Sequence, residues 1–155
     1  MPGCIFHVSG ENFDVDAFLA RSPFGPYRVA HRGEPKGRKS KRWPYSGFSV
    51  EVSKAYGDLA KQCEDVAAFL GEYHAEVSRL SAFPGVTDLR LDFGYERRDV
   101  AVQTDYLPPE LLVLVGSLGI GIVLTLYPNE RQMEEILCED DVAQPLLSPN
   151  GQKTK

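Results

Sequence analysis

The chain has 155 residues, a length typical of one domain, of which 43% are hydrophobic and 25% charged. This balance excludes a chain that is disordered over most of its length, and the net charge of −5 identifies no class of partner. Its three cysteines are odd in number and far apart, which argues against a disulfide framework and indicates reduced thiols: Cys4, Cys63 and Cys138.

Alternation, helical periodicity and turn residues divide the chain into short elements. Asp14 is placed to cap the first helix, and Asp58 to cap the second. The elements predicted in chain order are a strand at 4–9, a helix at 12–21, a strand at 27–32, a loop at 33–44, a strand at 48–53, a helix at 58–80, strands at 87–95 and 100–104, a helix at 108–117 and a strand at 120–127.

The helix at 58–80 has the clearest pattern. Its apolar positions recur in steps of three and four residues, which keeps them on one side of a helix. These positions are Leu59, Cys63, Val66, Leu70, Tyr73, Val77 and Leu80. The strand at 120–127 is β-branched and apolar enough to predict a central position in the sheet.

The predicted fold is α+β, with the order β-α-β-β-α-β-β-α-β. Its first six elements match the split βαβ, ferredoxin-like pattern, in which helices cover one face of a mainly antiparallel sheet. We expect one domain at 3–128, followed by an acidic, partly disordered tail at 129–155 that is loose from Pro145. A helical turn or two is expected in this tail through Met133, Ile136 and Leu137.

Several segments together resemble the bacterial domain of unknown function 4279 family. They are SGENFDVDAFLARS at the first strand and helix, HRGEP before a basic loop, WPYSGFSVEVS after it, the helix that ends in LSAFPGV, and YLPPELLVLVGSLGIGIVLTLYP. The resemblance covers about residues 3 to 128. It implies an α+β fold, a bacterial source and a cytoplasmic setting, and it implies no activity or site residues.

A membrane or secreted protein is not expected. The longest apolar stretch, 111–126, is shorter than the roughly 20 residues of a spanning helix and is interrupted by three glycines. The beginning of the chain lacks the basic and long apolar regions of a signal peptide. Both features favour a cytoplasmic protein.

No pattern predicts catalysis, a metal site or a cofactor. Cys4 and His7 lie three residues apart on a strand and face opposite ways. The glycines at 116, 119 and 121 follow a helix instead of opening one, so Gly119 is interpreted as a helix C-cap and not as part of a phosphate loop. His31 lies among positive charges, which we expect to disfavour its protonated form.

The segment 28–42 contains seven cations and one acid, a net charge of +6, which leaves −11 for the rest of the chain. Cations beside aromatic rings suit contacts to phosphates and bases. A match to the RNA-recognition motif fails, because Ser46 stands where an aromatic residue is expected. A loop that is only solvated is the other interpretation. The candidate binding residues are Arg32, Lys36, Arg38, Lys39, Lys41, Arg42, Trp43 and Tyr45.

We therefore expect a non-enzymatic protein-interaction or regulatory domain, of which an immunity-type role is one form. Binding of nucleic acid or another polyanion through the loop at 28–42 is the second hypothesis, and an enzyme of unrecognised type is the third. An antiparallel sheet of this kind can also offer an edge for a homodimer, although no pattern singles that edge out.

Overall fold

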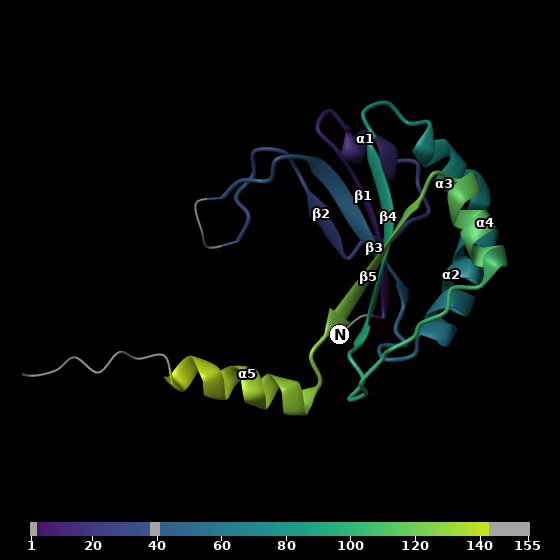
Figure 1. Ribbon diagram of the computed structural model, residues 1–155. Helices are drawn as coiled ribbons and strands as arrows, with labels where there is room; N and C mark the ends of the chain where they lie inside the picture. Colours follow the sequence, from purple (N-terminus) through teal and green to yellow (C-terminus); the bar gives the residue numbers. More distant parts are fainter. Residues whose placement is uncertain (1–2, 38–40, 143–155) are drawn as a thin grey trace, which may run out of the picture.

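A computed structural model describes residues 3–37 and 41–142 of the chain. Five strands form one sheet in the order β2-β3-β1-β4-β5 (Figure 1). The strands are β1 Cys4–Gly10, β2 Arg28–Ala30, β3 Ser46–Ser53, β4 Asp88–Glu96 and β5 Gly121–Tyr127. The pairings β1–β3, β1–β4 and β2–β3 are antiparallel, and β4–β5 is parallel. The sheet is therefore mixed.

Helices cover one face of this sheet. The helices are α1 Val15–Leu19, α2 Leu59–Glu72, α3 His74–Ser81, α4 Pro109–Ser117 and α5 Glu130–Val142. Side chains of α1 to α4 pack into the single core, whereas α5 continues beyond β5 and projects away from the sheet (Figure 1). The arm between β2 and β3 and the helix α5 both project on the side of the sheet that is away from α2, α3 and α4 (Figure 1). This side, which these helices do not cover, is the open face of the sheet.

Successive side chains of a strand point to opposite faces of the sheet, and this alternation decides which of them enter the core. On β1, Cys4, Phe6 and Val8 are buried against the helices, while His7 and Ser9 face the open side. Eight aromatic rings on the helix side form a cluster in which each ring centroid lies within 6.5 Å of at least one other. The rings belong to Phe6, Phe13, Phe18, Phe24, Phe48, Phe69, Tyr73 and Phe83. Burial of such rings is the main contribution to a core of this size.

The α+β class is confirmed, but the predicted order of elements is wrong. The chain runs β-α-β-β-α-α-β-α-β-α. A ferredoxin-like core is not confirmed as predicted, because the sheet has a fifth strand that pairs parallel to β4. The domain limits at 3–128 stay a prediction.

The long helix predicted at 58–80 is two helices, α2 and α3, which meet at Tyr73. The ring of Tyr73 lies 5.0 Å from that of Phe69 and 5.4 Å from that of Phe24, between centroids, and its backbone leaves the helical region. The apolar stripe itself is confirmed, since Val66, Leu70 and Val77 are fully buried. The predicted caps are also confirmed, because the carboxylates of Asp14 and Asp58 accept hydrogen bonds from the amides of Ala17 and Lys61.

No strand forms at 100–104, contrary to the prediction. Val100 and Val102 are exposed, and the segment is held instead by side-chain contacts of Arg98, whose guanidinium donates to the Thr104 carbonyl at 2.7 Å. Alternating apolar residues form a strand only where a neighbouring strand can accept their hydrogen bonds. Here β5 already occupies the edge of β4.

The last strand, β5, is not central, contrary to the prediction. It is the terminal strand of the sheet, and most of its side chains are partly or fully exposed. Gly119 does precede it as predicted, with the positive φ of 69° that suits a glycine after a helix. The helix α5 is longer than the predicted turn or two, and the predicted loose tail from Pro145 lies outside the described residues.

Candidate binding site on the open face of the sheet

The open face carries polar and charged side chains from neighbouring strands. The pairing register places His7 of β1 between Ser49 of β3 and Arg90 of β4. On the far side of β3, Arg28 of β2 is aligned with Ser49. Four strands therefore bring four polar side chains into one row across the sheet.

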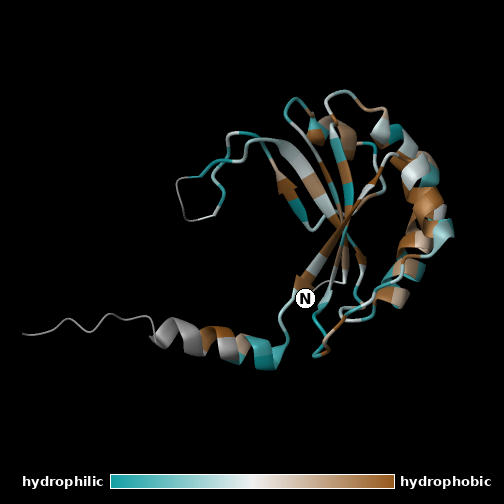
Figure 2. Cartoon of the chain, in the orientation of Figure 1, coloured by the Kyte–Doolittle hydropathy of each residue, from teal (hydrophilic) through white to brown (hydrophobic). Residues whose placement is uncertain are grey.

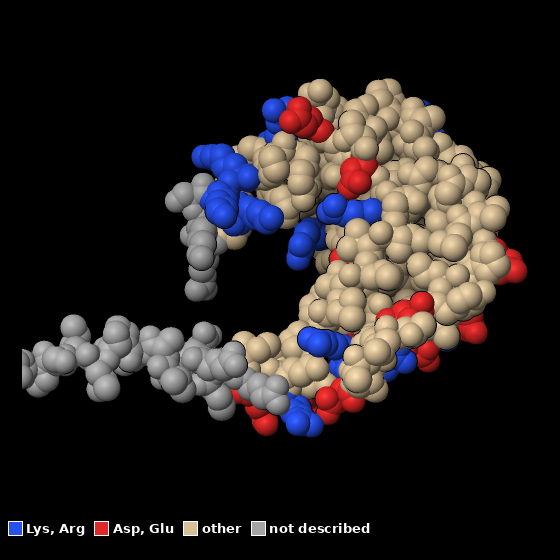
Figure 3. Space-filling view, viewed as in Figure 1, with Lys and Arg blue, Asp and Glu red and all other residues tan. Residues whose placement is uncertain are grey.

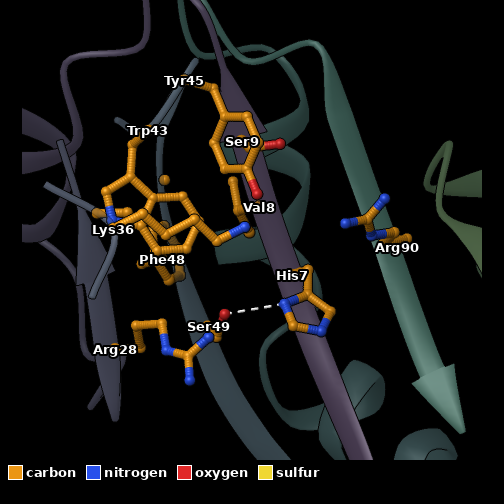
Figure 4. A pocket seen from close by; sticks show the side chains of 12 residues that line it. His7, Val8, Ser9, Arg28, Lys36, Trp43, Tyr45, Phe48, Ser49 and Arg90 are labelled. Atoms are coloured by element: carbon orange, nitrogen blue, oxygen red, sulfur yellow. Dashed lines mark hydrogen bonds between the residues drawn. The ribbon is translucent and has the colours of Figure 1, made fainter. Parts of the chain in front are cut away.

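The arm 31–45 folds over this row. Residues 33–44 were predicted as a loop, but backbone hydrogen bonds tie the two sides of the arm together: the Gly33 amide donates to the Trp43 carbonyl at 2.8 Å, and the Lys36 amide donates to the Lys41 carbonyl at 2.8 Å. Residues 38–40 lie outside the described part of the chain. The paired stem holds Lys36, Trp43 and Tyr45 above the sheet (Figure 4).

Between the stem and the sheet lies a pocket of about 150 Å³, which we call the basic pocket. Figure 4 shows its side chains converging from β1, β2, β3, β4 and the arm. The lining residues are His7, Val8, Ser9, Arg28, Ala30, Lys36, Trp43, Tyr45, Gly47, Phe48, Ser49 and Arg90. This volume is smaller than the roughly 300–1,000 Å³ of typical small-molecule sites and suits a small group such as a carboxylate.

Three cations line the basic pocket. Arg90 pairs with Asp88 at 3.6 Å, Lys36 lies 4.5 Å above the Trp43 ring and Arg28 lies 5.7 Å from the Tyr27 ring. Among the described residues, no carboxylate lies within ion-pair distance of Arg28 or Lys36. Figure 3 shows Lys and Arg side chains gathered around the hollow between the arm and the sheet. Arg28 and Lys36 thus bring positive charge to the pocket that no described carboxylate neutralises at ion-pair distance.

His7 forms the floor of the pocket. Its Nδ1 lies 2.9 Å from the hydroxyl of Ser49. Burial, together with the positive charges of Arg90 and Arg28, lowers the pKa of His7 below its ordinary value of 6.5, so the ring is neutral at pH 7. A neutral imidazole beside a serine hydroxyl can donate or accept one hydrogen bond to a ligand. Among the described side chains, no carboxylate is hydrogen-bonded to the other ring nitrogen, as it would be in a catalytic triad.

The structure brings together only part of the predicted set. Lys36, Trp43 and Tyr45 line the basic pocket, whereas Arg32, Lys41 and Arg42 are exposed elsewhere on the arm. Arg42 donates to the carbonyl of Gly33 and so supports the stem. Arg38 and Lys39 lie outside the described residues.

The predicted set lacked several polar residues of the pocket, among them His7, Ser49 and Arg90, while Arg28 belongs to the basic segment 28–42 but was not in the set. Each stands at a polar position of an alternating strand, which is the signal that marks the open face. Their strands are separated by up to 83 positions in sequence, so the row becomes visible only in the sheet register.

The expectation for His31 was wrong. Its ring bridges Asp16 of α1, at 3.0 Å from Nε2, and Glu34 of the arm, at 3.1 Å from Nδ1. Hydrogen bonds to these two carboxylates raise the pKa of His31 above its ordinary value. His31 therefore fastens the base of the arm to α1.

A second hollow, of about 350 Å³, lies between α2 and α4. It is lined mainly by apolar groups and by Cys63, and burial raises the pKa of that thiol. The Cys63 thiol is therefore protonated and packs as a small apolar group. The described residues contain no group of three or more His, Cys, Asp or Glu side chains that could hold a metal ion.

Comparisons with family models, with curated proteins and with solved structures found no match. No helix among the described residues is long and apolar enough to cross a membrane.

Proposed function

We propose that this chain is a non-enzymatic interaction domain whose basic pocket receives an acidic side chain of a partner protein. The observation that carries the proposal is the convergence of Arg28, Lys36 and Arg90 on one small pocket, although the chain as a whole is acidic. Two of these three cations have no ion-pair partner among the described residues. A carboxylate in the pocket would neutralise them and accept their hydrogen bonds.

The neighbouring residues favour a protein over a single-stranded nucleic acid. Arg, Trp and Tyr are the residue types that contribute most to protein interfaces, and Arg28, Trp43 and Tyr45 lie together here. Bases would need open aromatic faces on which to stack. Lys36 already covers one face of Trp43, and the rings of Trp43 and Tyr45 are tilted by 55°.

We retain three further proposals from the sequence. The resemblance to the domain of unknown function 4279 family supports a bacterial, cytoplasmic protein. An immunity-type or regulatory role would fit a small domain of this kind. The antiparallel order β2-β3-β1-β4, with α1 and α2 in its connections, supports a ferredoxin-like core to which α4 and β5 are added.

Trp43 gives the proposal a direct assay, because it is the one tryptophan of the chain and lines the pocket. We expect its fluorescence to change on titration with a poly-glutamate peptide. Arg28→Ala, Lys36→Ala or Arg90→Ala should each weaken binding about tenfold or more, since a hydrogen bond to a charged group contributes about 1.5–3 kcal/mol. Lys41→Ala is the matched control, because it removes the same charge from the arm outside the pocket.

A single-stranded oligonucleotide of equal charge forms the second arm of the experiment. Tighter binding of the oligonucleotide, lost in the same pocket variants, would replace the protein partner by nucleic acid. Equal binding by the wild type and all pocket variants would refute the pocket as a binding site. If the pocket variants do lose binding, a pull-down from host lysate with and without nuclease would identify the partner.

A further inference from the structure

The outer edge of β5 is an unprotected sheet edge. β5 is the terminal strand, so its outward backbone groups have no partner strand within the described chain. Its residues, GIVLTLY, include no charge and no proline. Natural proteins normally protect such an edge with a charge, a proline, a bulge or a covering segment. None of these is present along the seven described residues of β5.

The other edge strand of the sheet, β2, differs from β5 in length and in charge. β2 has only three residues, and one of them is the charged Arg28. A short and charged strand is one of the ways in which edges are protected. The contrast singles out β5 as the edge that is available for pairing.

The exposed side chains of β5 are large and aliphatic on both faces. Leu124 and Leu126 are 41% and 46% exposed although they stand on the helix-covered face, in register with β4 residues of the core. Val123 is exposed on the open face. Figure 2 shows β5 as a largely hydrophobic strand. Isolated exposed apolar residues are ordinary, but a row along an unpaired edge indicates an interface.

The sequence of β5 is complementary to itself. If two copies pair antiparallel about Leu124, that residue lies opposite its own copy, Ile122 lies opposite Leu126, and Val123 lies opposite Thr125. These three kinds of pair are aliphatic or β-branched, Gly121 lies opposite Tyr127 at the ends, and no like charges meet. An antiparallel pairing of identical strands has the twofold symmetry that most homo-oligomers adopt.

We infer that the chain forms a twofold homodimer through β5, in which the two sheets join into one continuous sheet. The row formed by Ile122, Leu124 and Leu126 of both copies then becomes buried on the helix-covered face. The helix α4, which leads into β5, also has exposed apolar side chains, Leu112 and Val113. The helix α5 does not obstruct the edge, because it continues past the end of β5 (Figure 1).

The test is a charge-swap experiment on the full chain by analytical ultracentrifugation. Wild type should sediment with about twice the 17.2 kDa mass of one chain. Leu124→Lys and Leu124→Glu should each halve this mass, because two like charges meet at the twofold axis. An equimolar mixture of the two variants should restore the dimer, since Lys then lies opposite Glu.

Val102→Lys is the matched control, because Val102 is 80% exposed outside β5 and should tolerate the charge without loss of the dimer. Circular dichroism confirms that each variant is folded. A wild type that has the mass of one chain at every loading concentration would overturn the proposal. So would single variants that keep the dimer mass, or a mixture that stays monomeric although both variants are folded.

Discussion

His7 lies where its protonation would alter the charge of the basic pocket. Its pKa is lowered by burial first, then by Arg90 and Arg28, while Asp92 and Asp88 act in the opposite direction. A carboxylate bound in the pocket would favour the charged imidazole. Proton uptake by His7 and binding of an anion should therefore strengthen each other.

We accordingly predict that poly-glutamate binds more tightly as the pH falls from about 7.5 to 5.5, a range in which glutamate with its usual pKa near 4.3 stays ionised. His7→Gln should remove most of this pH dependence in the Trp43 titration. His31→Gln should keep it, since His31 is bound to Asp16 and Glu34 at the base of the arm. A pH profile that is the same in wild type and His7→Gln would contradict the prediction.

Gln62 is a fully buried polar residue of α2. Its Nε2 donates to the carbonyl of Ala55 at 3.0 Å and to that of Gly94 at 2.9 Å, so one amide joins α2, the loop after β3, and β4. Gln62→Leu should lower the free energy of unfolding by about 1–3 kcal/mol, because the buried Gly94 carbonyl loses the Gln62 donor and the part-buried Ala55 carbonyl keeps only the bond from the Asp58 amide. Urea denaturation measures this change. Lys61→Ala, at the adjacent exposed position, should change it by less than about 1 kcal/mol.

At the scale of elements, the buried stripe of α2 and α3 gives a direct test of the fold. Leu70→Asp places an unpaired carboxylate at a position with no exposure, and we expect a loss of several kcal/mol or complete unfolding. Ala68→Asp is the control, because it adds the same charge to an exposed position of the same helix. Similar melting temperatures for the two variants would show that the stripe does not face the core.

Local patterns predicted the elements that depend on local contacts. The helix stripe, the caps Asp14 and Asp58, and the alternation of β4 all follow from neighbours within a few residues. Contacts between residues far apart in sequence decided the features that were predicted wrongly. Tyr73 interrupts the helix where its ring meets Phe24, and β5 is an edge strand because no further strand follows it in the sheet. Hydrophobic composition alone cannot distinguish a central strand from an edge that another copy covers.

Only some of the residues that line the basic pocket were in the predicted set, again because the others come together through distant contacts. Lys36, Trp43 and Tyr45 belong to one charged segment, which composition reveals. His7, Ser49 and Arg90 belong to three strands, and only the pairing register makes them neighbours. Arg32 and Arg42, which also belong to the predicted set, donate to backbone carbonyls and do not line the pocket.

At the scale of the whole molecule, the two proposed surfaces lie apart. The basic pocket is formed by β1 to β4 and the arm, and the proposed dimer edge is formed by β5. Arg90 of the pocket is aligned with Gly121 of β5, so the pocket comes near the proposed edge at this point. Mutations more than about 7–10 Å apart that share no partner are normally additive. We therefore expect the two surfaces to act independently.

The independence of the basic pocket and the β5 edge can be tested with one variant of each surface. Leu124→Lys should give a monomer whose Trp43 titration with poly-glutamate has the wild-type midpoint, whereas Arg28→Ala should weaken that titration and leave the dimer mass unchanged. Arg28 is the suitable pocket variant, because it lies on β2, at the opposite edge of the sheet from β5. If the monomeric variant lost peptide binding while it remained folded, the pocket would depend on the second copy. The positive charges of two joined sheets would then have to act on one partner together.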